Sequence, residues 1–329
     1  MNLRSSFPLA FLSRRPARAN GFTLIEMMIA VTIGLGILAG LTGVLATSSS
    51  NSKTNDRTSE LLSNGRYALN SMKHELRESG FRGYTWADPS APAAMGVIGN
   101  ECLEAGAADG TFVSNLRQAI WGANDANPFS GNCIPTASYA AGNDVLVVRR
   151  LSVLPATALT ANTVYFRSSF ERGQVFRGAV APVFTPVPAP LASFQMQVFV
   201  YYISPFTVSA AEIPLVPALY RVSLDNTGTM VRELVASGIE RMQVQYGRLT
   251  APDTQYLDTL AGASFSADAT TLTAWEDLNS VRIWLLARNA VAEPGYVNSN
   301  VYQLGSAPDY TPNDGFRRQL FTTVVQLRN

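Results

Sequence analysis

The chain has 329 residues, of which 47% are hydrophobic and only 15% charged, and its formal net charge at pH 7 is +1. A nearly neutral chain presents no broad basic field, which argues against a protein that specifically binds nucleic acid. The length is sufficient for a substantial hydrophobic core even if a terminal segment lies outside it.

An uncharged apolar stretch near the N-terminus is the most prominent feature of the sequence. Between Met27 and Ala46 there is no ionisable side chain. About 20 residues in a helix extend over about 30 Å, which is enough to cross the hydrocarbon core of a bilayer. Arginines precede this stretch, so the positive-inside rule predicts a cytoplasmic N-terminus and export of everything that follows. These arginines are Arg4, Arg14, Arg15 and Arg18.

Glu26 stands at the very start of the apolar stretch. A carboxylate well inside a membrane costs about 2.5–3.5 kcal/mol on insertion scales, and less near the interface, so Glu26 requires a partner. The apolar residues that follow offer none. A new amino terminus could supply one if the chain were cut between Gly21 and Phe22.

The hexapeptide from Gly21 to Glu26, GFTLIE, resembles the processing site of type IV prepilins and related pseudopilins at all six positions. The resemblance implies that a prepilin peptidase removes residues 1–21 as a leader, cuts after Gly21 and methylates the new N-terminal Phe22. It also implies that Glu26 pairs with the terminal amine of a neighbouring subunit during assembly. Because the small residue precedes the apolar stretch, cleavage would leave the anchor attached, unlike cleavage of a secretory signal. A leader of this length is long for the family, and the alternative is an ordinary signal anchor.

A helical pattern continues beyond the apolar stretch. Leu62, Leu69, Met72 and Leu76 fall on one face of a helix, and no proline occurs between residues 22 and 81. The sequence therefore predicts one N-terminal spine helix over residues 22–80. Its first part would span the membrane at about residues 27–46, and its amphipathic second part would lie against a sheet.

Gly36 and Gly40 form a pair of small residues four apart within the membrane part of this helix. Such a pair lets two helices approach closely in lipid. We expect Gly36 and Gly40 to pack against helices of other subunits.

Residues 83–142 are rich in Ala, Gly, Asn, Asp and Pro and have little periodicity. The sequence predicts a long loop region with a single short helical turn near residues 112–118, and such a region requires something to hold it. The two cysteines of the chain, Cys102 and Cys133, both lie within it. In an oxidising compartment a disulfide closing about 32 residues contributes about 3–4 kcal/mol. A metal site is disfavoured because the one histidine, His74, falls on the helix.

The pattern changes to strands after residue 142. Pro182, Pro186, Pro188 and Pro190 mark a connection that cannot be a central strand. Asp225 to Gly228 is typical of a hairpin turn. Consecutive strands joined by short turns after one helix predict an α+β fold, in which the long N-terminal helix packs on antiparallel sheets in an exported, β-rich head of residues 81–329. The predicted strands are residues 144–153, 163–167, 174–180, 194–203, 218–224, 230–236, 239–246, 280–288 and about 319–327.

No catalytic, cofactor-binding or metal-binding pattern occurs in the sequence. Paired acids are present, but no base or further ligand accompanies them, and we interpret them as solvated loop charge. These pairs are Glu101 with Glu104, Asp253 with Asp258, and Glu276 with Asp277. The sequence therefore predicts no enzyme and no cofactor.

Segments of the head resemble the PilW-type minor pilins of type IV pili. They are residues 143–146, 234–247, 281–288 and 317–329. The resemblance implies a structural subunit in an inner-membrane and then pilus location, acting in pilus assembly or initiation near the tip. Its expected partners are the prepilin peptidase, other minor pilins, the major pilin, the inner-membrane assembly platform and a tip adhesin.

Two other functions fit parts of the sequence. One is a large minor pseudopilin of type II secretion, similar to the J-type subunit, which would be processed in the same way. The other is a membrane-anchored periplasmic enzyme or binding domain, which would not need the carboxylate of Glu26.

Overall fold

The computed structural model describes residues 21–93, 95–187, 189–250, 252–266 and 269–327. All of the predicted leader except Gly21 lies outside the described residues. The chain divides into two compact units, Met1–Asn55 and Asp56–Asn329, which are described separately.

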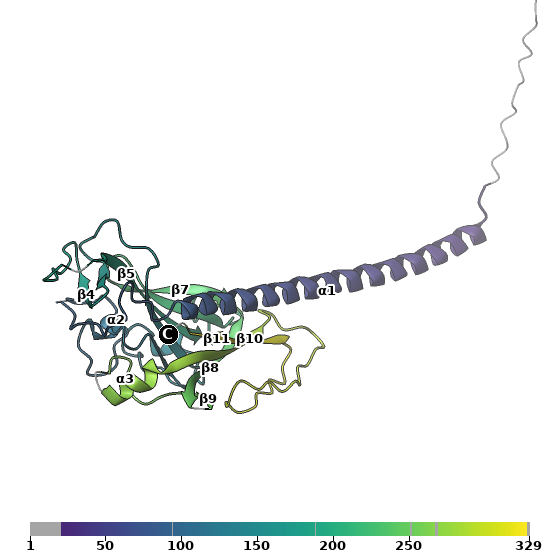
Figure 1. Cartoon of the computed structure of the whole chain (residues 1–329). Helices are drawn as coiled ribbons and strands as arrows, with labels where there is room; N and C mark the ends of the chain where they lie inside the picture. The colour runs from purple at the N-terminus through teal and green to yellow at the C-terminus, as the bar shows by residue number, and fades with distance from the viewer. Residues whose placement is uncertain (1–20, 94, 188, 251, 267–268, 328–329) are drawn as a thin grey trace, which may run out of the picture. The chain divides into compact units, whose positions relative to one another are not determined.

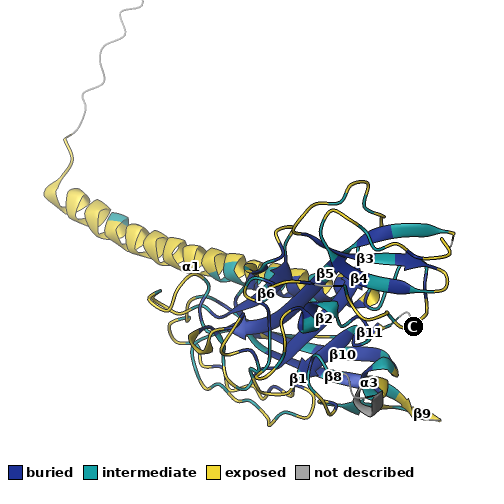
Figure 2. Cartoon of the chain, turned by 90° about the vertical axis from the view of Figure 1, so that its left-hand side faces the viewer, coloured by how far each residue is buried: buried dark blue, intermediate teal, exposed yellow. Residues whose placement is uncertain are grey.

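Helix α1 spans Leu24–Arg77 and is continuous over its 54 residues (Figure 1). Its first part is exposed along nearly its whole length (Figure 2). Its second part, from Asp56, buries one face, as expected of an amphipathic helix. Of the predicted apolar residues, Met72 and Leu76 are buried, and Leu62 and Leu69 are half-buried at the margin of this face. The helix ends before Gly80, whose φ of 76° is a left-handed conformation that stops a helix at little cost to glycine. Among the described residues, α1 is the one helix long and apolar enough to cross a membrane.

The head contains two antiparallel sheets. The seven-stranded sheet has the order β1-β2-β5-β3-β4, with β6 paired to β5 and β7 paired to β6, and the four-stranded sheet has the order β11-β10-β8-β9. The strands of the first sheet are β1 (Ile120–Ala123), β2 (Val145–Leu151), β3 (Val164–Ser169), β4 (Gly173–Arg177), β5 (Leu191–Ser204), β6 (Ala218–Leu224) and β7 (Met230–Ser237). Those of the second are β8 (Ile239–Thr250), β9 (Asp253–Leu257), β10 (Leu278–Arg288) and β11 (Arg318–Gln326). The short helices are α2 (Thr111–Ser114), η1 (Thr136–Ser138) and α3 (Ala269–Glu276).

The predicted α+β fold is confirmed, since one long N-terminal helix precedes antiparallel sheets. Each predicted strand corresponds to an observed one, and the hairpin at residues 225–228 joins β6 to β7. Four elements were missed: β1, η1, β9 and α3. β1 and β9 have only four and five residues, too short for alternation to be recognised, and each becomes a strand by pairing with a longer neighbour.

The second part of α1 is attached to both sheets of the head. Gly65 allows a close approach to β11, because a Cβ at this position would lie 2.2 Å from the ring of Phe321. Arg150 of β2 reaches the helix from the other sheet, with its Nε 2.6 Å from Glu75 and its Nη1 2.6 Å from Glu78. Both Arg150 and Glu75 are more than nine-tenths buried, so the pair holds the helix at one register.

Candidate processing and assembly site

Gly21 and Phe22 precede α1 in an open segment. Nothing lies within 4 Å of the position that a Cβ on Gly21 would take, and the Phe22 side chain is 84% exposed. The peptide bond between them is therefore accessible in this chain. Accessibility is what cleavage by a peptidase requires.

Glu26 has a partner that the sequence analysis did not recognise. One of its carboxylate oxygens accepts hydrogen bonds from the Thr23 amide and from the Thr23 hydroxyl, each 2.9 Å long. The Glu26 amide in turn donates to the Thr23 hydroxyl oxygen at 3.3 Å. This reciprocal arrangement is a capping box, which satisfies amides that the first helical turn leaves without a partner. The sequence analysis looked for a partner only among the apolar residues that follow Glu26, and the spacing Thr-x-x-Glu was the signal for this partner on the other side.

The first part of α1 presents apolar side chains to its surroundings on every face. Members more than half exposed include Ile25, Met27, Met28, Ile29, Val31, Ile33, Leu35, Ile37, Leu38, Leu41, Val44 and Leu45. Cβ atoms placed on Gly36 and Gly40 would meet nothing within 4 Å. Neither glycine is thus explained by a contact within the unit, and both leave space for the backbone of another helix.

The predicted disulfide between Cys102 and Cys133 is present in the head. Both cysteines are fully buried. The neighbouring Glu101 is also buried, and its carboxylate accepts hydrogen bonds from the amides of Gly110 at 2.6 Å and Val113 at 3.0 Å. Burial raises the pKa of Glu101, while these two bonds oppose the rise. The interpretation of Glu101 as solvated loop charge was therefore wrong.

Arg149 of β2 is a second buried charge that holds the loop region of residues 83–142. Its guanidinium donates to the carbonyl oxygens of Phe112 at 2.8 Å, Gln118 at 2.7 Å and Ser264 at 2.8 Å. Burial lowers the pKa of Arg149 to about 9, and Glu101 and Glu104 oppose this shift. The side chain therefore stays charged at neutral pH and joins three segments that are distant in sequence.

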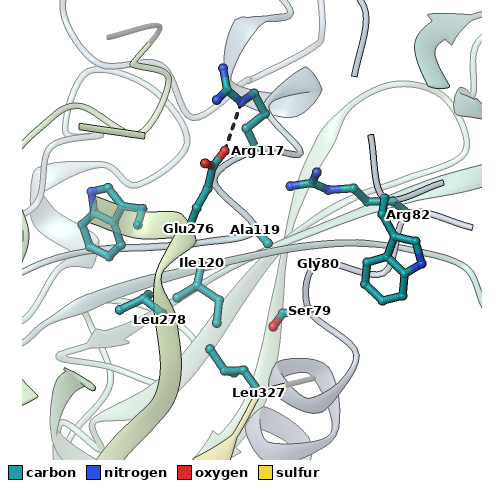
Figure 3. A pocket seen from close by; sticks show the side chains of 11 residues that line it. Ser79, Gly80, Arg82, Arg117, Ala119, Ile120, Glu276, Leu278 and Leu327 are labelled. Carbon is teal, nitrogen blue, oxygen red and sulfur yellow. Dashed lines mark hydrogen bonds and ion pairs between the residues drawn. The ribbon is translucent and has the colours of Figure 1, made fainter. Parts of the chain in front are cut away.

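A pocket of about 170 Å³ lies where the chain leaves α1. In Figure 3, Arg117 and Glu276 face each other at one end of it, with Nε and Oε1 3.0 Å apart. Arg117 also lies 3.4 Å from Asp88, and the hydroxyl of Ser79 donates to the carbonyl oxygen of Leu76. The charged side chains here neutralise one another, and the serine is engaged with the backbone.

Glu104, Asp258 and the histidine have structural partners. Glu104 accepts a hydrogen bond from the Ser264 amide, and Asp258 accepts one from Gln245. His74 lies on α1 beside Glu78 with its side chain 65% exposed. Among the residues that the structure describes, no group of three or more His, Cys, Asp or Glu side chains could hold a metal ion.

Three comparisons bear on the family. The family model described as Type IV Pilus-assembly protein W matches residues 200–329. The model described as Prokaryotic N-terminal methylation motif matches residues 16–42. Comparison with curated protein sequences gives no match.

Among solved structures, a type IV-like pilin from Thermus thermophilus matches with 12% identity and a TM-score of 0.35, covering 81% of this chain and 95% of that chain. This likeness is too remote to carry an argument. The two family matches fall on the segments that the sequence singled out, the hexapeptide with its apolar helix and the C-terminal strands. Together they support a minor pilin of the type IV pilus, of the PilW type.

Proposed function

We propose that the chain is made as a prepilin, cut after Gly21, methylated at Phe22, and incorporated at low copy number near the tip of the pilus. The observation that carries this proposal is the match of the methylation motif to residues 16–42. It coincides with an accessible bond after Gly21 and an apolar helix whose side chains are exposed.

The proposed route begins in the inner membrane, with the leader in the cytoplasm and the head in the periplasm. Cleavage creates a basic amine at Phe22. Glu26 attracts the amine of a neighbouring subunit as the helices leave the bilayer, and burial among helices replaces contact with lipid. The Thr23 cap keeps the carboxylate at the start of α1, so an incoming amine meets it in a fixed position.

A position near the tip follows from the size of the head. A major subunit repeats along the shaft and must pack against copies of itself on all sides, which disfavours a head as large as Asp56–Asn329. A priming complex with other minor pilins, assembled on the inner-membrane platform and below a tip adhesin, accommodates such a head. The partners needed are the prepilin peptidase and the other pilins.

The first test is the intact mass and N-terminal sequence of the protein from membranes and from sheared pili. We expect a mature chain beginning with methylated Phe22, present in the pilus fraction at low abundance. An uncut chain in both fractions would contradict processing. Abundance equal to that of the major subunit would contradict the placement near the tip.

A second test separates assembly from simple anchoring. Glu26→Ala is expected to insert in the membrane at the wild-type level but to be lost from sheared pili. Glu26→Asp, which keeps the charge, serves as the matched control. If Glu26→Ala were incorporated normally, a membrane-anchored enzyme or binding domain would become the better proposal.

A pseudopilin of type II secretion would be cut and methylated in the same way, so processing alone does not separate the two machines. Deletion of the gene separates the two machines. We expect loss of twitching motility with unchanged secretion of exoproteins.

A further inference from the structure

Asn143 and Asp144 join the two sheets of the head. They directly precede β2 of the seven-stranded sheet, yet they bond to β8 of the four-stranded sheet. The Asp144 amide donates to the Met242 carbonyl at 3.1 Å, and the Met242 amide donates to the Asn143 side-chain oxygen at 2.8 Å. The Val244 amide donates to Asp144 Oδ2 at 2.6 Å. This short segment therefore covers the part of the β8 edge that β9 does not reach, since β9 pairs only with residues 246–250.

The Asp144 carboxylate is the centre of this junction. Its second oxygen accepts a hydrogen bond from the Asp125 amide at 3.0 Å, which ties the turn after β1 to the same point. Asp125 in turn accepts a hydrogen bond from Gln243 of β8 at 2.9 Å. Asp144 is 1% exposed, so its charge has little access to water.

The charged groups around Asp144 are all of one sign. The carboxylates of Asp125 and Asp258 act on it unfavourably, and the other titratable neighbours are the phenols of Tyr246 and Tyr139. Among the residues that the structure describes, no arginine, lysine or histidine forms an ion pair with any of these three carboxylates. The buried Tyr246 hydroxyl makes no hydrogen bond to any described residue. Only backbone amides stabilise the ionised form of Asp144.

Burial raises the pKa of Asp144 to about 7, and the two nearby carboxylates add to the rise while the amides of Asp125 and Val244 oppose it. An acid with a raised pKa binds its proton more tightly in the folded state than in the unfolded state. The folded state is therefore favoured at acidic pH and loses this advantage as the pH rises from about 4 to about 7.

We propose that this junction is a proton-sensitive clamp, which holds the two sheets together most firmly when Asp144 is protonated and loosens when it ionises. Protonation removes a buried negative charge that lies beside two others, at the cost of one of the two amide hydrogen bonds to the carboxylate. The bonds of Met242 to the Asp144 amide and to the Asn143 side chain do not involve the carboxyl group and remain in both forms. The clamp is a property of the head and does not depend on the proposed processing or placement of the subunit.

The test measures the midpoint of thermal unfolding of the full chain in detergent between pH 5 and pH 8. For the wild type we expect the midpoint to fall by about 5 °C or more over this range. Asp144→Asn cannot titrate and is expected to show a clearly smaller fall, whatever its stability at a single pH. Glu101 contributes equally to the pH dependence of the unfolding midpoint in both proteins, so its contribution cancels when the two slopes against pH are compared.

Two further variants test the role of the neighbouring charges. Asp125→Asn and Asp258→Asn keep an oxygen that can accept the bonds from Gln243 and Gln245, but each removes one negative charge. Both are expected to reduce the fall between pH 5 and pH 8. Asp253→Asn, at an exposed position of β9, is the matched control and should keep the wild-type slope.

A direct titration completes the test. Carbon NMR of the Asp144 carboxyl should show a midpoint above about pH 5.5 in the folded protein. A midpoint near its ordinary value, about 4, or identical slopes for the wild type and Asp144→Asn, would overturn the proposal.

Discussion

The side chain of Glu26 serves two purposes in this protein. The capping box uses Glu26 to satisfy the first amides of α1, and the proposed assembly step uses the same carboxylate to bind an amine. A carboxylate has two oxygens, and the hydrogen bonds from Thr23 engage only one of them. The cap and the incoming amine are therefore compatible.

The first prediction concerns Thr23. Thr23→Ala removes the hydroxyl that donates to Glu26 and accepts from its amide, and loss of such a cap costs about 1 kcal/mol. We expect amide exchange in the first turn of α1 to become about five-fold faster in detergent, as measured by hydrogen–deuterium exchange. Thr23→Ser keeps the hydroxyl and should exchange as the wild type does. Equal rates in all three proteins would contradict the cap.

The second prediction for a single residue concerns Arg149. Arg149→Met fits the space but leaves the carbonyl oxygens of Phe112, Gln118 and Ser264 without their donor in a buried site. We expect the free energy of unfolding to fall by about 3 kcal/mol or more, measured by urea denaturation. Arg66→Met, at an exposed position of α1, is the control and should change stability by less than about 0.5 kcal/mol. A loss as small as that of the control would mean that the three carbonyls do not need this donor.

At the scale of elements, α1 is one helix with two different environments. Its first part has no core of its own, and its second part is part of the core of the head. The surroundings of the glycines differ between these two environments. Gly65 is required by a contact within the head, whereas Gly40 has free space around it.

A matched pair of substitutions tests this difference. Gly65→Ala would place a Cβ 2.2 Å from Phe321, and the strain exceeds the gain of about 1 kcal/mol that alanine brings to a helix. We expect the free energy of unfolding to fall by about 1–2 kcal/mol while membrane insertion persists. Gly40→Ala should leave the stability of the isolated subunit unchanged or slightly higher and should reduce its recovery in sheared pili. Normal incorporation of Gly40→Ala would remove the packing role that we assign to this glycine.

At the scale of the whole molecule, the loop region of residues 83–142 is held by more than the disulfide. Glu101 holds α2 through two amides, and Arg149 binds one carbonyl oxygen within α2 and one shortly after it. The disulfide and these buried charges therefore act on the same region by different means. The disulfide restricts the unfolded chain, and the charges stabilise the folded one.

The corresponding prediction is that the head survives the loss of the disulfide with reduced stability. Replacing both Cys102 and Cys133 by Ser should lower the free energy of unfolding by about 3–4 kcal/mol, with an unchanged far-ultraviolet circular dichroism spectrum. In the native wild type, thiol reagents should label neither sulfur unless a reductant and a denaturant are both added. Labelling of both thiols without a reductant would show that the bridge does not form in the native protein.

The sequence by itself determined the features that depend on neighbouring residues. A long uncharged run predicts a membrane helix, the hexapeptide predicts the methylation motif, and alternating β-branched segments predict the strands of both sheets. The spacing of Leu62, Leu69, Met72 and Leu76 predicted the packed side of α1 to within one residue, because helical geometry alone decides which residues share a face.

Only the tertiary structure determined which charged side chains are buried. Glu101, Asp144 and Arg149 look like ordinary polar residues in the sequence, and each is buried because segments far apart along the chain close around it. Arg149, for example, binds residues 112, 118 and 264 at once. Burial of a charge is a property of such long-range contacts and of the amides and carbonyls they supply, and no local pattern encodes them.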